Sequence, residues 1–145
     1  MGGPKAIAWR APIRLVFSAG PNAALLTLPD TTLWYADADA EVVAAYELHQ
    51  VLGTNGSAVT ADVMKVADGT IIASGTSVLT TTFDLKATVA TWQKRTISNG
   101  GISQTQSTRI VNAGQTLGIN FDGTMTACAG INIVVLLQYL REPSW

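Results

Sequence analysis

The stretch that decides the fold class is "GINFDGTMTACAGINIVVLLQYL", residues 118–140. An apolar side chain stands at every second position of "LGINFD", residues 117–122, and this period of two is typical of a half-buried β-strand. Asp122-Gly123 then supplies residues that tolerate the positive φ angles of tight turns. The sequence therefore predicts a strand, a loop that begins at Asp122, and a second strand over residues 131–140.

The second of these strands is apolar on both faces. One face carries Ile131, Ile133, Val135, Leu137 and Tyr139, and the other carries Asn132, Val134, Leu136, Gln138 and Leu140. A strand at the surface of an isolated sandwich alternates more cleanly between apolar and polar residues. We therefore expect this strand either to be central and covered on both sides or to be buried against a neighbouring subunit, with Leu136 at that interface.

Three further Asn-Gly or Asp-Gly pairs separate apolar or alternating segments, at residues 55–56, 68–69 and 99–100. The segments predict strands over 13–17, 31–36, 41–52, 62–67, 77–85, 91–97, 107–112, 116–122 and 131–140. The β-branched residue threonine, which fits an extended backbone, is abundant in them. We predict an all-β protein, namely an antiparallel two-sheet β-sandwich that is jelly-roll-like and has an extended N-terminal arm.

The segment "EVVAAYELHQVL", residues 41–52, alternates in the same way, although its alanines also permit a helix. Read as a strand, it carries Val42, Ala44, Tyr46, Leu48 and Leu52 on one face and Val43, Ala45, Glu47, His49 and Val51 on the other.

The chain of 145 residues is expected to form one domain over residues 13–145, preceded by an arm over residues 1–12. Glycines and prolines interrupt any regular strand pairing in that arm. A single cysteine excludes an intrachain disulfide. We expect no membrane association, because no apolar run reaches the length of a membrane span.

Charged residues are scarce, at 13% of the chain where about a quarter is ordinary. Nine basic and ten acidic residues nearly cancel, and there is no run of Lys and Arg, so we do not expect nucleic-acid binding. Apolar residues make up 48%. This composition suits a subunit packed into an assembly, where unpaired charges are costly to bury.

Candidate catalytic residues are few. The lone histidine, His49, lies in a predicted strand with no nucleophile beside it in the sequence, and a hydrogen-bonded or surface role is the commoner one for such a residue. Cys128 is flanked by small residues and is of a type that is usually buried. The sequence contains no nucleophile elbow, phosphate-binding loop or dinucleotide fingerprint. We therefore expect no enzymatic activity and no cofactor.

Acidic residues at a spacing of two, Asp37, Asp39 and Glu41, are the most site-like cluster. On one face of a strand they could offer oxygen ligands to Ca²⁺. The alternative is that they solvate a loop or protect the edge of a sheet from pairing. The sequence lacks the glycine-containing loop of an EF-hand here, so we assign no metal site and leave ion binding open.

Four tryptophans are many for this length, and tryptophan and arginine are enriched at the centres of protein interfaces. Trp34 lies in an apolar predicted strand and is expected to be structural, whereas Trp92 precedes Lys94-Arg95 and is expected to be exposed. Near the termini, burial within one subunit is hardest to arrange. The residues predicted to contact a partner are Trp9, Arg10, Trp92, Leu136 and Trp145.

Several pieces of the chain form a recognisable series. They are a strand with a "GTNGSAVTADV" turn, an "FDLKAT" step, an "AGQTLGINFDGT" hairpin and a terminal apolar strand. From about Ala44 to Leu140 their order resembles that of small virion proteins of tailed bacteriophages and prophages. Residues 1 to about 40 lie outside this resemblance.

The resemblance implies a capsid cement (decoration) protein or a head-fibre component that is located on the capsid surface and assembled in the host bacterial cytoplasm. Its partners are then the major capsid protein of a tailed phage and other copies of itself, in a dimer or trimer. The alternative that we keep open is a carbohydrate- or receptor-binding module of a phage head or tail fibre.

Overall fold

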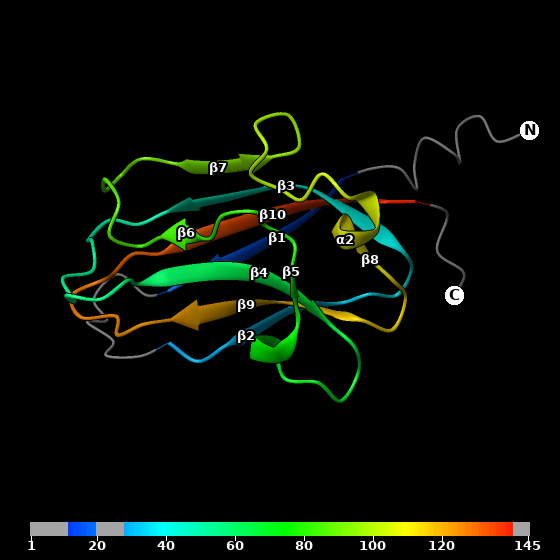
Figure 1. Ribbon diagram of the computed structural model, residues 1–145, viewed down its shortest axis with the longest axis horizontal. Coiled ribbons are helices and arrows are strands. Elements are labelled where there is room, and N and C mark those ends of the chain that lie inside the picture. Colours follow the sequence, from blue (N-terminus) through cyan, green and yellow to red (C-terminus); the bar gives the residue numbers. More distant parts are fainter. Residues whose placement is uncertain (1–11, 20–27, 141–145) are drawn as a thin grey trace, which may run out of the picture.

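Two antiparallel β-sheets packed face to face make up the structure, a computed structural model that describes residues 12–19 and 28–140 (Figure 1). The first sheet contains β1 (Pro12–Ser18), β10 (Asn132–Tyr139), β3 (Ala40–Leu48) and β7 (Gln93–Thr96), with β8 (Ile110–Val111) also paired to β3. The second sheet contains β2 (Thr31–Tyr35), β9 (Thr116–Asp122), β4 (Thr60–Val66) and β5 (Thr76–Ser77), with β6 (Phe83–Asp84) also paired to β4. The predicted β-sandwich is confirmed.

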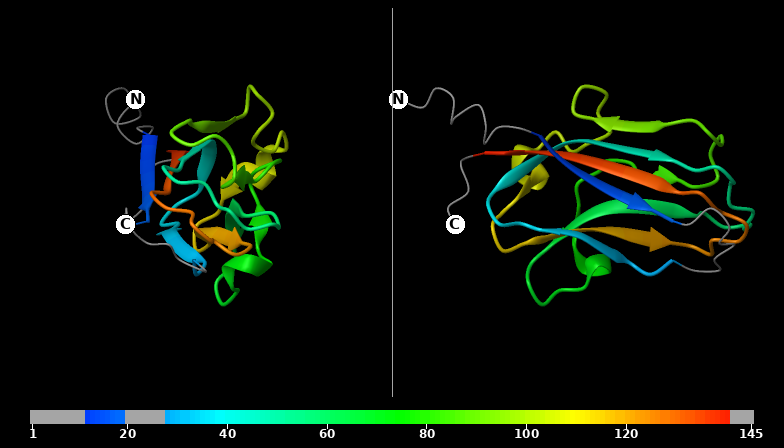
Figure 2. Two further views of the ribbon diagram at one scale, coloured as in Figure 1. Left: turned by 90° about the vertical axis from the view of Figure 1, so that its left-hand side faces the viewer. Right: turned by 180° about the vertical axis from the view of Figure 1, so that it is seen from behind.

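The order of the strands is that of a jelly roll. The first strand, β1, pairs with the last, β10, and β2 pairs with β9, so the two ends of the chain interleave in both sheets. Although β9 and β10 follow each other in the sequence, they lie in opposite sheets (Figure 2). The segment "AGQTLGINFDGT" is therefore not a hairpin, because β8 before it belongs to the first sheet and β9 to the second.

Two predicted strands are shorter than expected. The segment 77–85 is divided into β5 and β6, because Leu79 leaves the ladder of β4 and bridges Ile102 instead. The segment 107–112 begins as a helical turn, α2 (Gln106–Arg109), and only its last part pairs as β8. The Arg109 side chain donates to Glu41 Oε2 at 2.9 Å and to the Ser103 carbonyl at 2.7 Å, which ties this turn to β3.

Residues 1–11 and 141–145 lie outside the described residues, and so do most of the predicted arm and the last five residues of the predicted domain. Pro12, the last residue of the predicted arm, is the first residue of β1. Proline suits the first position of an edge strand, where a missing N–H breaks no ladder hydrogen bond.

The core lies between the two sheets and is almost entirely aliphatic and aromatic. The predicted inner face of β10 is confirmed, since Ile133, Val135 and Leu137 have no exposed surface and Ile131 is 1% exposed. From the second sheet, alternate residues of β4 and β9 pack against them. The largest fully buried side chains of the core outside β10 include Phe83, Leu85, Ile102, Leu117, Ile119 and Met125.

A β-bulge in β3 decides which of its side chains face the core. Val42 and Ala44 pair with consecutive residues of β10, so Val43 between them has no partner of its own. An extra residue shifts the alternation of side chains by one position. Val42 is buried before the bulge, and Glu47 and His49 are buried after it, each with no exposed surface. The uninterrupted alternation predicted over 41–52 is therefore wrong beyond Val43.

Part of the outer face of the second sheet is covered by the chain itself. The short helix η1 (Ile72–Ser74) lies on this face, where Ile72 forms a small buried cluster with Met64 and Val66 of β4. Gly118 of β9 permits the approach, because a Cβ at this position would collide with the Ile72 side chain. The chain itself therefore covers the part of this face that lies over Met64 and Val66, whereas Tyr35 of β2 is 63% exposed.

Gly123→Ala is expected to destabilise the protein by roughly 3 kcal/mol or more. Gly123 has a φ of +90°, which costs an L-residue about 1–2 kcal/mol, and a Cβ there would also collide with the backbone carbonyl of Ala58. Gly69→Ala is the matched control, because Gly69 also has a positive φ, +78°, but open space around it. Urea unfolding measures both variants. Equal losses of unfolding free energy would contradict the steric part of this prediction.

Candidate functional site

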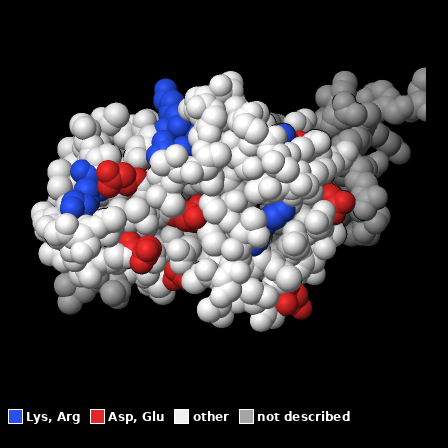
Figure 3. Space-filling view, viewed as in Figure 1, with Lys and Arg blue, Asp and Glu red and all other residues white. Residues whose placement is uncertain are grey.

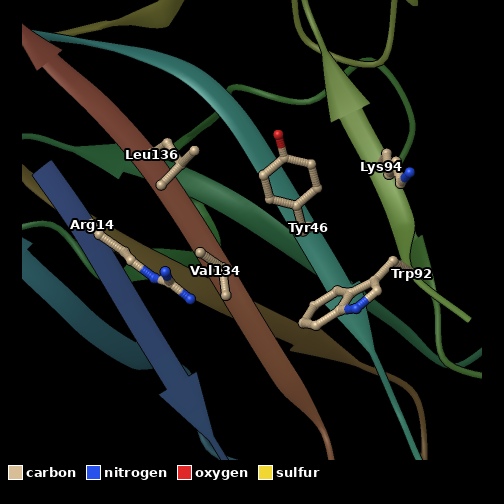
Figure 4. A pocket seen from close by; sticks show the side chains of 6 residues that line it. All are labelled: Arg14, Tyr46, Trp92, Lys94, Val134 and Leu136. Atoms are coloured by element: carbon tan, nitrogen blue, oxygen red, sulfur yellow. The ribbon is translucent and has the colours of Figure 1, made fainter. Parts of the chain in front are cut away.

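A shallow groove of about 300 Å³ crosses the outer face of the first sheet. It is lined by Arg14, Tyr46, Trp92, Lys94, Val134 and Leu136. Figure 4 shows Val134 and Leu136 side by side on β10, with Arg14 on one side of them and Tyr46 and Trp92 on the other. These side chains come from four strands or their immediate ends, so the groove is a property of the assembled sheet.

Backbone pairing places these residues on one surface. Val134 of β10 pairs with Tyr46 of β3, and Tyr46 pairs with Lys94 of β7. Two residues further along β10, Leu136 pairs with Arg14 of β1. Alternate residues of a strand point to the same side of a sheet, so all five positions face outward once the bulge in β3 has set the phase of Tyr46.

Trp92 is the most conspicuous apolar residue of the groove. It lies just before β7, two residues from Lys94 and hence on the same face, and it is 43% exposed. Val16 of β1, next to the groove, pairs with Val134 and is 56% exposed. Tryptophan is enriched at interface hot spots, and Val16 adds exposed apolar surface beside it.

The charge of the groove is positive. Arg14 and Lys94 are both exposed, and no acidic side chain stands among the described residues that line the groove. Within the described part of the chain, neither cation forms an ion pair. Figure 3 shows how sparse charges are on the face it displays. The groove therefore places two cations that have no ion pair among the described residues beside an apolar surface.

Glu47 and His49 form a buried polar pair inside the sandwich, and this pair has a structural role. His49 Nδ1 donates to Glu47 Oε1 at 2.8 Å, and His49 Nε2 donates to the Ala87 carbonyl at 2.9 Å. Both ring nitrogens face oxygen acceptors, an arrangement that favours the doubly protonated imidazolium. Gln93 Nε2 donates to the second carboxylate oxygen of Glu47 at 2.7 Å. The hydrogen bond to Glu47 is the main cause that raises the pKa of His49 above 6.5, against the opposing effect of burial.

Neither candidate catalytic residue is placed for chemistry. Both nitrogens of His49 are occupied by Glu47 and Ala87, and the side chain has no exposed surface. Cys128 is 2% exposed, and burial raises the pKa of its thiol to about 11, so the thiol is protonated at neutral pH. A protonated, buried thiol is a poor nucleophile. The geometry instead fits the hydrogen-bonded histidine and the buried cysteine that the sequence favours.

The acidic residues 37, 39 and 41 do not converge. Asp37 accepts a hydrogen bond from the Tyr139 hydroxyl at 2.8 Å, and Asp39 accepts one from the Ala113 backbone N–H at 2.8 Å. Glu41 pairs with Arg109. Within residues 12–19 and 28–140, no three His, Cys, Asp or Glu side chains are grouped as metal ligands. These carboxylates hold loops and a helical turn against the strands.

Two of the five predicted interface residues, Trp92 and Leu136, line the same groove. The other three, Trp9, Arg10 and Trp145, lie outside the described residues. Four lining residues were missed by sequence reasoning, namely Arg14, Tyr46, Lys94 and Val134. The signal that could have found most of them is their alternation with core residues in the strands over 13–17, 91–97 and 131–140. Tyr46 also needs the bulge.

The tryptophan predicted to be structural, Trp34, is half-buried and packs edge-on against the Tyr139 ring, with 6.3 Å between the centroids.

Neither helical segment of the described residues is long and apolar enough to cross a bilayer. Comparison of the sequence with protein-family models and with curated proteins identified no match. The fold and the groove together therefore define an antiparallel jelly-roll sandwich with an apolar and cationic sheet face.

Proposed function

We propose that the protein is a structural virion protein, a capsid cement or decoration protein that binds the outer face of a tailed-phage head through protein–protein contacts. The observation that carries the proposal is the groove on the first sheet. It combines an exposed tryptophan, a tyrosine and an arginine, the residue types most enriched at interface hot spots, with two aliphatic side chains and Lys94.

The exposed apolar side chains of the first sheet support this proposal. On its outer face Trp92 is 43% and Val16 56% exposed, next to the groove. An exposed apolar surface rimmed by polar groups marks a site of interaction. Repeating a modest contact over many copies on a shell gives a large total stabilisation, so each single site needs only moderate affinity. The protein then acts as a dimer or trimer on the capsid surface, after assembly in the host bacterial cytoplasm.

Co-sedimentation tests the proposal. The purified protein is mixed with tailed-phage capsids that lack it and is expected to pellet with them, whereas Trp92→Ala is expected to bind roughly 30-fold more weakly, as for a hot-spot residue worth about 2 kcal/mol. The matched control is Ile71→Ala, because Ile71 is 71% exposed but lies beside the second sheet. If the protein stays in the supernatant under conditions that preserve the shell, the cement proposal is contradicted.

A second candidate function is carbohydrate binding on a fibre. Trp92 and Tyr46 lie in the same groove, and aromatic faces stack on sugar rings. A glycan array distinguishes the two functions. A cement protein is expected to bind no glycan on the array, whereas a fibre module is expected to bind a defined glycan, and Trp92→Ala is expected to abolish that binding.

A further inference from the structure

We infer that the groove takes an extended segment of the partner protein in which an apolar residue is flanked by two carboxylates, in the pattern acidic–x–apolar–x–acidic. The inference rests on the proposed function and names the chemistry of the partner. It is argued from the charge of the groove, from the spacing of its two cations and from the nature of its lining.

Charge gives the first requirement. Arg14 and Lys94 lie on opposite sides of the apolar centre, and within the described residues neither has a carboxylate partner. A partner that covers the groove removes water from both cations, and leaving a buried charge unpaired is costly. Complementary carboxylates on the partner offset that cost and also direct the encounter.

The same charges exclude a second copy that packs its own groove against this one. Two copies related by a two-fold axis through this groove would bring Arg14 and Lys94 of one copy against the same two cations of the other. No acidic residue among the described lining residues compensates for that repulsion. The occupant is therefore a different surface, and an acidic one.

The distance between Arg14 and Lys94 sets the spacing of the two acidic residues in the bound segment. Arg14 is on β1 and Lys94 on β7, and the strand order places three inter-strand steps between them. Steps of about 4.8 Å put the two strands about 14 Å apart, and Arg14 lies two residues, about 7 Å, further along the sheet than Lys94, so the two positions are about 16 Å apart. An extended chain rises about 3.4 Å per residue, so residues i and i+4 span about 14 Å and point to the same side, and the long side chains of Arg14 and Lys94 reach across the remaining difference. Residue i+2 then points at the centre of the groove, where it meets Val134 and Leu136.

The lining favours a peptide over a sugar. Val134 and Leu136 are aliphatic and form the middle of the groove, where Tyr46 contributes the one hydroxyl among the described lining residues. Sugars need several directed hydrogen bonds from polar side chains, whereas an apolar side chain of a peptide needs only close packing. An anionic glycan remains an outcome that the experiment separates.

The test is an NMR titration of the full chain with two synthetic peptides, "TDTFTET" and its uncharged match "TNTFTQT". We expect the acidic peptide to shift the signals of Arg14, Tyr46, Trp92 and Leu136, and to bind at least roughly 10-fold more tightly than the amide peptide at low salt. Raising the salt concentration weakens the acidic peptide only. Equal affinities of the two peptides, signals that move elsewhere, or no binding of the acidic peptide would each overturn the inference.

Charge-reversal variants locate the contacts. Arg14→Glu and Lys94→Glu, both at exposed positions, are each expected to weaken the acidic peptide roughly 10-fold. Lys86→Glu is the control, since Lys86 contacts the Ser57 carbonyl and lies outside the groove. Circular dichroism verifies that each variant is folded. Unchanged affinity in the Arg14 and Lys94 variants contradicts the inference.

Capsid co-sedimentation separates this inference from the proposed function. If the wild-type protein binds capsids and Arg14→Glu and Lys94→Glu bind them equally well, the acidic pattern is wrong and the cement function stands. If the wild-type protein does not bind capsids but binds the acidic peptide in the groove, the cement function is wrong and the acidic pattern of the ligand is supported. Binding of an anionic glycan in place of the acidic peptide overturns the peptide assignment.

Discussion

Ile133→Asp should leave the chain unfolded, whereas Leu136→Asp should give a folded protein that has lost its partner. The two residues lie on the same strand, β10, but on opposite faces. Ile133 has no exposed surface and packs in the core between the sheets. Replacing it removes about 2–5 kcal/mol of core packing and buries a carboxylate at a further cost of several kcal/mol. The sum is comparable to the whole stability of a small domain, about 5–15 kcal/mol.

Leu136 is half-buried on the outer face, where an aspartate stays in contact with water. We expect a loss of unfolding free energy of about 1 kcal/mol, in the range of an ordinary surface or half-buried substitution. The lost affinity is expected to be much larger, because the carboxylate replaces an apolar contact at the centre of the groove.

Circular dichroism and urea unfolding measure the folding of both variants, and capsid co-sedimentation measures binding. Ile133→Val is the conservative control and should cost only about 0.5–1.5 kcal/mol. If Leu136→Asp unfolds as readily as Ile133→Asp, the outer face of β10 is a second core and not a docking surface. If Leu136→Asp folds and binds capsids normally, the groove is not the contact site.

The second large effect is expected from Glu47→Gln, which removes the anion that faces the buried imidazolium of His49. Both side chains of the pair have no exposed surface, and His49 Nδ1 lies 2.8 Å from Glu47 Oε1. Removing one partner of a buried ion pair costs about 3–5 kcal/mol, because the other charge is left unpaired. The matched control is the double variant Glu47→Leu, His49→Leu, which removes both charges and should recover most of the loss. Equal destabilisation by the single and double variants would rule out the charge as the cause.

The pH dependence of stability has a definite sign. The pKa of His49 is raised in the folded protein above its ordinary value of 6.5, mainly by its hydrogen bond to Glu47. The ion pair therefore contributes its full stabilisation below pH 6.5, and this contribution is lost as the pH rises through the folded pKa. Besides Glu47, the groups that face His49 are the Ala87 carbonyl and, at longer range, Asp84. Urea unfolding of the wild type from pH 5.5 to 9 should show this decline, and Glu47→Gln should show much less of it.

Two of the six residues that line the groove could be predicted from the sequence, whereas the buried pair of Glu47 and His49 inside the sandwich could not. Trp92 and Leu136 were predicted as contact residues from composition and alternation, and the structure places them together. Glu47 and His49 have the sequence signature of an outward, polar face, opposite Val42. The bulge at Val43 turns them inward, because one unpaired residue reverses every following side chain. Nothing in a local hydrophobic pattern shows where a neighbouring strand skips a residue.

Local chemistry by itself determined most of the strands, several of the turns, the scarcity of charge and the core face of β10. Alternation and turn residues act over a few neighbouring positions, so these features are readable in the sequence. Only the tertiary structure decided that β9 and β10 lie in opposite sheets, that η1 covers one sheet, and that Arg14, Lys94 and Leu136 form one groove. The physical reason is that strand order and register depend on packing between segments far apart in the sequence. Pro12 of β1 pairs with Gln138 of β10, for example, and each such pairing gains stability only from the whole core.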